Sequence, residues 1–158
     1  MIRTAEPADV PVLLALVREL AAYEREPDAV VATEQLLQEA LFGAHPVASC
    51  HVALDEHGEV AGFALWYVTF STWTGRPGLW LEDLFVRPAA RRLGLGRQLL
   101  QALAAVCVER GYPRFEWWVL DWNEPAHAFY RSLGARAEDE WTTWRLDGAA
   151  LAGLADGR

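Results

Sequence analysis

The sequence contains no lysine, and all 14 of its basic residues are arginines. A P-loop nucleotide site needs a lysine after its second glycine, so the sequence excludes that class of phosphate site. Cysteine is also scarce. Cys50 and Cys107 lie far apart, and the four histidines are scattered along the chain. Because these spacings match neither a disulfide framework nor a zinc site, we expect no bound metal.

Long apolar runs are absent too. No run approaches the 18 residues of a membrane-spanning helix, and the first residues do not form a signal-peptide pattern, so we expect a cytoplasmic protein without a membrane partner. The formal net charge is −8. Nucleic-acid binding requires a basic face, so this charge argues against a nucleic-acid partner, and it is compatible with a cationic substrate.

The chain does have ample material for a hydrophobic core. Its 158 residues are 53% hydrophobic and include eight tryptophans. Length and composition therefore predict one globular domain over residues 1–148, followed by a C-terminal tail, 149–158, that frays.

Hydrophobic periodicity and turn residues predict a mixed α/β order. The predicted helices cover residues 7–24, 33–42, 95–110 and 123–133, and the predicted strands cover 2–5, 49–54, 59–70, 79–86, 114–120 and 141–146. A loop over 71–78 contains Trp73.

The most informative stretch is 79–100, where a strand leads into a basic turn and then directly into a helix. The first N–H groups of a helix lack internal partners and carry partial positive charge, so they attract anions. Gly94 and Gly96 let the backbone approach a diphosphate without a Cβ clash. A dinucleotide fingerprint would need a third glycine where this chain has Leu99. The stretch therefore predicts a pyrophosphate site of another kind.

The stretch from Arg91 to Gly96 resembles the acetyl-CoA signature of the GNAT N-acetyltransferases. The resemblance covers roughly residues 2–147 and is strongest to the branch that contains spermidine/spermine and thialysine acetyltransferases. Its further matches are Glu19-Leu20-Ala21-Ala22-Tyr23-Glu24, Gly43-Ala44-His45-Pro46, Leu81-Glu82-Asp83-Leu84-Phe85-Val86, Trp122-Asn123-Glu124-Pro125 and Phe129-Tyr130. It implies the acyl-CoA N-acyltransferase fold, with a central, mostly antiparallel splayed sheet flanked by helices, and a homodimer with substrate sites near the subunit interface.

The resemblance also implies how acetyl-CoA is held. The backbone of one strand end pairs with the pantetheine amides, the basic turn holds the pyrophosphate, and a helix start further along contacts the cofactor. These groups are Leu84, Phe85 and Val86 for the strand, Arg91, Arg92, Leu93, Gly94, Leu95, Gly96 and Arg97 for the turn, and Asn123, Glu124, Pro125 and Ala126 for the helix start. Asn123 also suits the N-cap of that helix.

Two residues are candidates for proton transfer. Glu82 lies in an otherwise apolar strand, where a buried carboxylate needs a reason, and strict alternation places it on the opposite face from Asp83. The resemblance assigns the Glu82 position to amine binding and, through water, to proton removal. Tyr130 follows Asn123 by seven residues, so the two lie on nearly the same helix face. The resemblance makes the Tyr130 phenol the acid for the departing CoA thiolate.

The remaining candidates concern the amine. Tyr23, Glu24 and Trp73 match the amine-binding residues of the branch, and Trp117 and Trp118 are further candidates to line the cleft. One position departs from the polyamine enzymes, since Thr142 stands where they carry an acidic residue. This departure weakens the case for long polyamines. From the resemblance we predict direct attack of a small cationic amine, a polyamine or diamine, on acetyl-CoA in a ternary complex. A thialysine-like amino acid or another small amine is an alternative substrate, and a non-catalytic acyl-CoA-binding domain is a second alternative.

Overall fold

Five strands form one sheet in the order β1-β2-β3-β4-β5. The computed structural model describes residues 1–157, and the strands are β1 (Ile2–Thr4), β2 (Ser49–Leu54), β3 (Val60–Ser71), β4 (Arg76–Val86) and β5 (Phe115–Trp117). The first four pair antiparallel, and β5 runs parallel to β4. The chain forms two compact units, residues 1–118 and residues 119–158.

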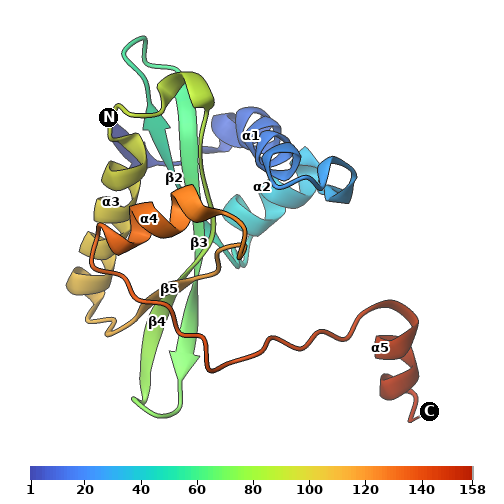
Figure 1. The fold of residues 1–158 in the computed structure, drawn as a ribbon. Helices are drawn as coiled ribbons and strands as arrows, with labels where there is room; N and C mark the ends of the chain where they lie inside the picture. Colours follow the sequence, from blue (N-terminus) through green and yellow to red (C-terminus); the bar gives the residue numbers. More distant parts are fainter. Residues whose placement is uncertain (158) are drawn as a thin grey trace. The chain divides into compact units, whose positions relative to one another are not determined.

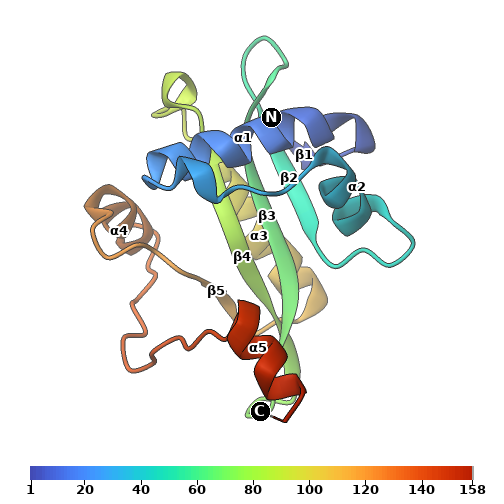
Figure 2. The ribbon, with the colours of Figure 1, turned by 90° about the vertical axis from the view of Figure 1, so that its right-hand side faces the viewer.

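Helices cover both faces of this sheet (Figures 1 and 2). On one face lie α1 (Val10–Tyr23) and α2 (Glu34–Phe42), and on the other lies α3 (Leu95–Arg110). Short 3-10 turns precede α1 at Pro7–Asp9, follow it at Pro27–Ala29 and link β4 to α3 at Pro88–Ala90. The predicted mixed α/β fold with a mostly antiparallel sheet is confirmed.

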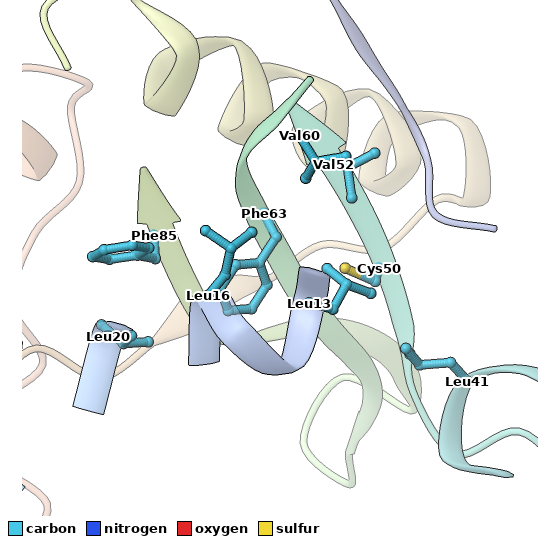
Figure 3. Close-up of a cluster of buried hydrophobic side chains, with 9 residues drawn as sticks. All are labelled: Leu13, Leu16, Leu20, Leu41, Cys50, Val52, Val60, Phe63 and Phe85. Carbon is cyan, nitrogen blue, oxygen red and sulfur yellow. The ribbon is translucent and has the colours of Figure 1, made fainter. Parts of the chain in front are cut away.

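The core between α1 and the sheet fixes the helix that carries two candidate amine-binding residues. Leu13, Leu16 and Leu20 of α1 pack against Phe63 of β3 and Phe85 of β4 (Figure 3). All five are buried. Each such side chain contributes about 1.5–3 kcal/mol when it is fully removed from water. Phe85 therefore anchors the end of β4 to α1, directly beside the basic turn.

The β3–β4 hairpin is longer than the sequence indicated. β3 continues to Ser71 and pairs there with Arg76, so the predicted loop over 71–78 reduces to a tight turn at its tip. Within the hairpin, Leu65 pairs with Asp83 and Trp66 pairs with Leu81. Glu82 has no partner opposite it, which makes it the extra residue of a β-bulge.

β5 covers only part of β4. It pairs along Leu79–Leu81 and stops, whereas the sequence predicted a strand over 114–120. Between residues 82 and 86, β4 has β3 on one side and no described strand on the other. The sheet therefore opens between its last two strands, as the predicted splayed sheet requires.

The second unit contains α4 (Glu124–Arg131) and α5 (Gly148–Ala155). One prediction is wrong here. The structure has no strand over 141–146, because this segment pairs with no strand among residues 1–157. The predicted tail contains most of α5, since its alanine- and leucine-rich composition favours a helix, and its fraying stays a prediction. Arg158 lies outside the described residues, and the predicted single-domain organisation stays a prediction.

Candidate active site

The basic turn forms an open cradle at the start of α3. Gly94 is the N-cap of this helix and has a φ of 77°, in the left-handed region. Arg92 also has a positive φ, 66°, which is uncommon for a residue with a side chain. The first internal hydrogen bond runs from the Gln98 N–H to the Gly94 carbonyl. The amides of residues 95–97 precede it, so they are oriented outward without helical partners.

This cradle suits a diphosphate. A Cβ on Gly94 would meet nothing closer than the Gln98 side chain, at 3.8 Å, so the space around the turn is open. Arg92 and Arg97 are exposed beside it. Outward N–H groups, the positive end of the α3 dipole and two exposed cations together make a favourable anion site. These are the residues that could hold the diphosphate of CoA.

The free edge of β4 leads directly into the cradle. Leu84, Phe85 and Val86 lie beyond the last residue that pairs with β5. A backbone edge of this kind can pair with an extended ligand as with an added strand. One of its carbonyls is already engaged, because Arg91 Nε donates to the Val86 oxygen at 3.0 Å.

The bulge at Glu82 corrects one expectation. Strict alternation placed Glu82 and Asp83 on opposite faces of the sheet. In the structure, Glu82 is held by Trp80, and Asp83 is close enough to Glu24 of α1 for its charge to act on Asp83. Both carboxylates therefore face α1, because a bulge adds one residue and reverses the alternation beyond it.

Two side chains flank the Glu82 carboxylate. The Trp80 indole nitrogen donates to Glu82 Oε2 at 3.1 Å. The Tyr67 hydroxyl on the neighbouring strand lies near enough for Glu82 to act on it, and burial together with the nearby Glu82 carboxylate raises the pKa of Tyr67. Glu82 itself is exposed, so its carboxylate is oriented by these neighbours and remains accessible to a ligand.

Among the carboxyl groups of the site, that of Asp83 has the most strongly shifted pKa. Burial, followed by the negative charges of Glu82 and Glu24, raises its pKa to about 6. Burial also raises the pKa of Glu24, which lies at the C-cap of α1. Three carboxylates from the end of α1 and from β4 thus form one acidic cluster, defined here as Glu24, Glu82 and Asp83, in which Glu82 is exposed and the other two are partly buried. Such a cluster favours a cation.

Of the predicted cleft tryptophans, some lie near the acidic cluster and others do not. Trp118 contacts Trp80 edge-on, with ring centroids 4.8 Å apart, and is 62% exposed. Trp117 instead packs against Phe115 at 5.0 Å. Trp73 lies at the hairpin tip, and the stretch of β4 between positions 76 and 82 spans about 20 Å at the usual rise per residue. The structure therefore brings Trp118 to the acidic cluster and leaves Trp73 away from it.

Tyr23 belongs to the same region through the cradle. Its ring lies 5.1 Å from the guanidinium carbon of Arg91, and Arg91 also lies 5.7 Å from the Phe85 ring. The first unit thus joins Tyr23, Glu24, the acidic pair of β4 and the cradle in one continuous region.

The second unit holds the other candidates. Asn123 is the N-cap of α4, where its side-chain oxygen accepts from the Ala126 N–H at 3.4 Å. Glu124 and Pro125 form the first turn. Tyr130 lies near the end of this helix with its ring 5.3 Å from that of Phe129. The predicted N-cap is confirmed, and the cofactor contacts of this helix start stay a prediction.

Other kinds of site find little support in the described part of the chain. Burial raises the pKa of the Cys50 thiol to about 12, so its nucleophilic thiolate is strongly disfavoured. Residues 1–157 contain no cluster of histidine, cysteine or acidic residues able to hold a metal ion. None of their helices is both long and apolar enough to cross a bilayer.

Sequence reasoning missed three residues of this region: Asp83, Trp80 and Tyr67. The adjacent acids in an apolar strand are a signal for Asp83, but strict period-2 alternation does not predict the bulge that turns both to the same face. Tyr67 carried no signal in sequence, because its approach to Glu82 depends on the register of β3 against β4. Trp80 lies two residues before Glu82 on the same strand, a spacing that places both side chains on one face.

Comparisons with known proteins agree with this geometry. Residues 13–135 match the Acetyltransferase (GNAT) family. A thialysine N-epsilon-acetyltransferase from Sus scrofa is 38% identical over 98% of this chain and 96% of its own. An L-ornithine N5-acetyltransferase from Arabidopsis thaliana is 31% identical over 95% of this chain and 85% of its own. An integron cassette protein from the mobile metagenome of V. cholerae is 30% identical, with a TM-score of 0.81 over 98% of this chain and 96% of its own.

The matched span includes β4, the cradle, α3 and α4, the elements that carry most of the predicted cofactor and catalytic residues. The chain therefore belongs to the GNAT acetyltransferase family and is an acetyl-CoA-dependent N-acetyltransferase.

Proposed function

We propose that this enzyme transfers the acetyl group of acetyl-CoA to the terminal primary amine of a small cationic molecule. The observation that carries the proposal is the acidic cluster of Glu24, Glu82 and Asp83, because two of its members lie on the same strand that leads into the cradle. A cationic amine held there lies beside the open edge of β4, where the pantetheine arm is expected to bind. Tyr23 and Trp118 add aromatic surface suited to a cation.

The reaction requires a group that accepts a proton from the amine. An alkylammonium group with a pKa of about 10.4 is neutral in only about 10⁻³·⁴ of molecules at pH 7, an obstacle of roughly 4.6 kcal/mol. A proton acceptor must remove that proton before the nitrogen attacks. The Glu82–Asp83 pair is suited to take it, directly or through water, since the pKa of Asp83 is about 6 and its carboxyl is mostly ionised at pH 7.

In the proposed reaction the neutral nitrogen attacks the thioester carbonyl in a ternary complex. A C–N bond forms, the C–S bond breaks, and the acetyl group leaves on the amine. The departing thiolate takes a proton from the Tyr130 phenol, and the proton that the nitrogen loses as the amide forms returns to Tyr130 through solvent, so the products are the acetylated amine and CoA thiol. A phenol is a weak acid and a good hydrogen-bond donor to a developing thiolate.

For the substrate we propose first an amino-acid-type amine of the thialysine or ornithine class. The Sus scrofa and Arabidopsis thaliana relatives are named for such substrates. Thr142 also replaces the acidic residue expected of enzymes for long polyamines. A short diamine is the second candidate and a long polyamine the third.

An amine panel tests this ordering. Thialysine, ornithine, lysine, putrescine and spermidine are each incubated with acetyl-CoA, released CoA thiol is measured, and products are identified by mass spectrometry. We expect the amino-acid amines to give the highest kcat/KM. A preference for spermidine would reverse the ordering, and activity only on an uncharged amine would overturn the cationic class.

A matched pair of variants tests the site. Glu24→Gln removes one charge of the acidic cluster and should raise the KM for the amine with little change in acetyl-CoA binding. Added salt should raise the wild-type KM in the same direction by screening. Glu26→Gln removes the same charge two residues along, at an exposed position, and serves as the control. Equal amine KM values for the two variants would place the cation elsewhere.

We also propose a cytoplasmic homodimer. Several large apolar side chains of the second unit are exposed in the single chain, among them Trp144 at 91%, Leu151 and Leu154. Exposed apolar surface of this extent is typical of an interface. Light scattering at micromolar concentration should give about twice the chain mass of 17.6 kDa, and a monomer mass would contradict the dimer.

A further inference from the structure

Two arginines of the segment that joins β4 to α3 reach across to the last turns of α1. Arg87 contacts Glu19 through Nε, at 3.0 and 3.1 Å, and through a terminal nitrogen at 2.8 Å. Arg91 lies over the Tyr23 ring, 5.1 Å from its centroid. Glu19 and Tyr23 are four residues apart and therefore share one face of α1. The two contacts form parallel links between the same pair of segments.

Arg91 is also fixed to its own segment. Its Nε donates to the Val86 carbonyl at 3.0 Å, and its guanidinium carbon lies 5.7 Å from the Phe85 ring. Cation–π contacts of this kind attract the guanidinium to both rings. With three partners around it, the guanidinium bridges the end of β4 and Tyr23.

The same short segment continues into the cradle. Arg92 and Gly94, whose positive φ angles shape the turn, follow Arg91 by one and three residues. A diphosphate bound to the amides of residues 95–97 must order this segment, and Arg91 is its contact with the amine-binding end of α1. Glu24, the next residue after Tyr23, belongs to the acidic cluster.

We propose that Arg91 is a positioning residue that links occupancy of the cradle to the order of Tyr23, so that CoA and the amine favour each other's binding. The part that concerns the amine rests on the proposed function. The physical reason is that CoA, by ordering the segment, reduces the entropy that amine binding must remove from Tyr23. Because such coupling is reciprocal, the amine must strengthen CoA binding by the same factor.

The sign of the coupling follows from the contacts of Arg91. If the diphosphate drew its guanidinium away from Tyr23, the two ligands would oppose each other. Arg91 is exposed like Arg92 and Arg97, but its guanidinium is bound to Val86 and packed on two rings. Arg92 and Arg97 make no such contacts within residues 1–157, so we expect them and the α3 amides to take the diphosphate while Arg91 keeps its contact with Tyr23.

Hydrogen exchange tests the link without any amine. The Glu24 and Arg25 amides, which bond to the carbonyls of Leu20 and Ala22, report on the end of α1. In the wild type, saturating CoA should slow exchange of a peptide spanning residues 19–26 by about fivefold or more, the lower end for coupled sites. Arg91→Met should abolish this CoA-dependent slowing. Arg92→Met removes the same charge from the same turn and should retain the slowing when CoA is again saturating.

A second measurement titrates the best amine of the panel calorimetrically, with and without CoA. The wild type and Arg92→Met should bind the amine about fivefold more tightly with CoA, and Arg91→Met should show no such gain. Tyr23→Leu removes the other side of the contact and should lose the slowing as well, which covers the case in which Arg91→Met does not fold.

The outcomes separate the two proposals. CoA-dependent slowing of exchange without binding of any amine would sustain the link and overturn the proposed substrate class. Amine binding without a difference between the Arg91→Met and Arg92→Met variants would overturn the link and leave the substrate class standing. Weaker amine binding in the presence of CoA would also overturn it. Failure of CoA to bind would overturn the cradle and the link together.

Discussion

The indole nitrogen of Trp80 donates a hydrogen bond to Glu82 across the bulge of β4, with 3.1 Å between Nε1 and Oε2. Tyr67 approaches the same carboxylate from β3. A side chain at a bulge would otherwise have few neighbours to fix its direction. The Trp80 hydrogen bond, with the Tyr67 hydroxyl close by, therefore fixes the direction of the Glu82 carboxylate relative to Asp83 and to the open edge of the sheet.

Trp80→Phe and Tyr67→Phe each remove one donor and keep an aromatic ring. We expect each to lower kcat/KM for the amine by about three- to tenfold, the effect of one partly exposed hydrogen bond to a charged group. Acetyl-CoA affinity should stay near the wild-type value. Tyr112→Phe deletes a hydroxyl elsewhere and is the control. Steady-state kinetics in which all three variants match the wild type would show that these donors do not position Glu82.

Asp83→Asn tests the shifted carboxyl. In the wild type, kcat/KM for the amine should fall as the pH drops below about 6, because the protonated carboxyl can no longer accept a proton. The variant should lose this limb and about 10²–10⁴-fold in rate, the usual range for a general base. Asp28→Asn, at an exposed position, is the charge-matched control.

The raised pKa of Asp83 affects the stability of the fold in the opposite direction from the rate. Because the pKa of Asp83 is about 6 in the folded chain and 3.8 for an unperturbed aspartate, this group makes the fold more stable as the pH falls from about 6 towards 3.8. Loss of rate below pH 6 therefore does not arise from unfolding through Asp83. Melting temperatures measured at each pH of the rate profile check this, and an acid limb retained in Asp83→Asn would assign it to another group.

Gly94→Ala and Gly111→Ala form a matched pair at the two ends of α3. Both glycines have a positive φ, 77° and 67°, and both have open space at the Cβ position. Each substitution should cost about 1–2 kcal/mol in unfolding free energy through backbone strain. Only Gly94→Ala should weaken CoA binding, by about tenfold if one charge-assisted hydrogen bond is lost. Denaturation and calorimetry measure the two effects, and equal CoA affinities would remove the diphosphate from this turn.

Tyr130→Phe deletes one oxygen and keeps the ring against Phe129. If the phenol protonates the departing thiolate, kcat should fall by about 10²–10⁴-fold. Acetyl-CoA affinity should change little, because the hydrogen bond strengthens only as charge develops on sulfur. Measuring kcat, melting temperature and affinity on one preparation separates this role from a packing role, in which only the melting temperature would move.

The parts of the site that sequence predicted are those encoded locally. The cradle depends on Gly94 and on the start of α3, which lie within a few residues of each other, and the N-cap at Asn123 is equally local. The bulge at Glu82 depends on how β3 and β4 align over many residues, so a period-2 pattern placed Asp83 on the wrong face. The segment over 141–146 has a strand-like composition, yet a strand also needs a partner edge, which composition does not encode.

The opening between β4 and β5 has a consequence for handling the enzyme. Strand edges normally lie at the outside of a sheet, where charge or a bulge protects them from pairing with other molecules. Here an edge at residues 82–86 lies inside the sheet, and the bulge and charge at Glu82 and the Arg91 contact with the Val86 carbonyl protect only its two ends until a ligand pairs with the rest. We therefore expect the ligand-free protein to aggregate sooner on warming or storage than protein purified with CoA. The cofactor would then act as a protective partner for the backbone as well as an acetyl donor.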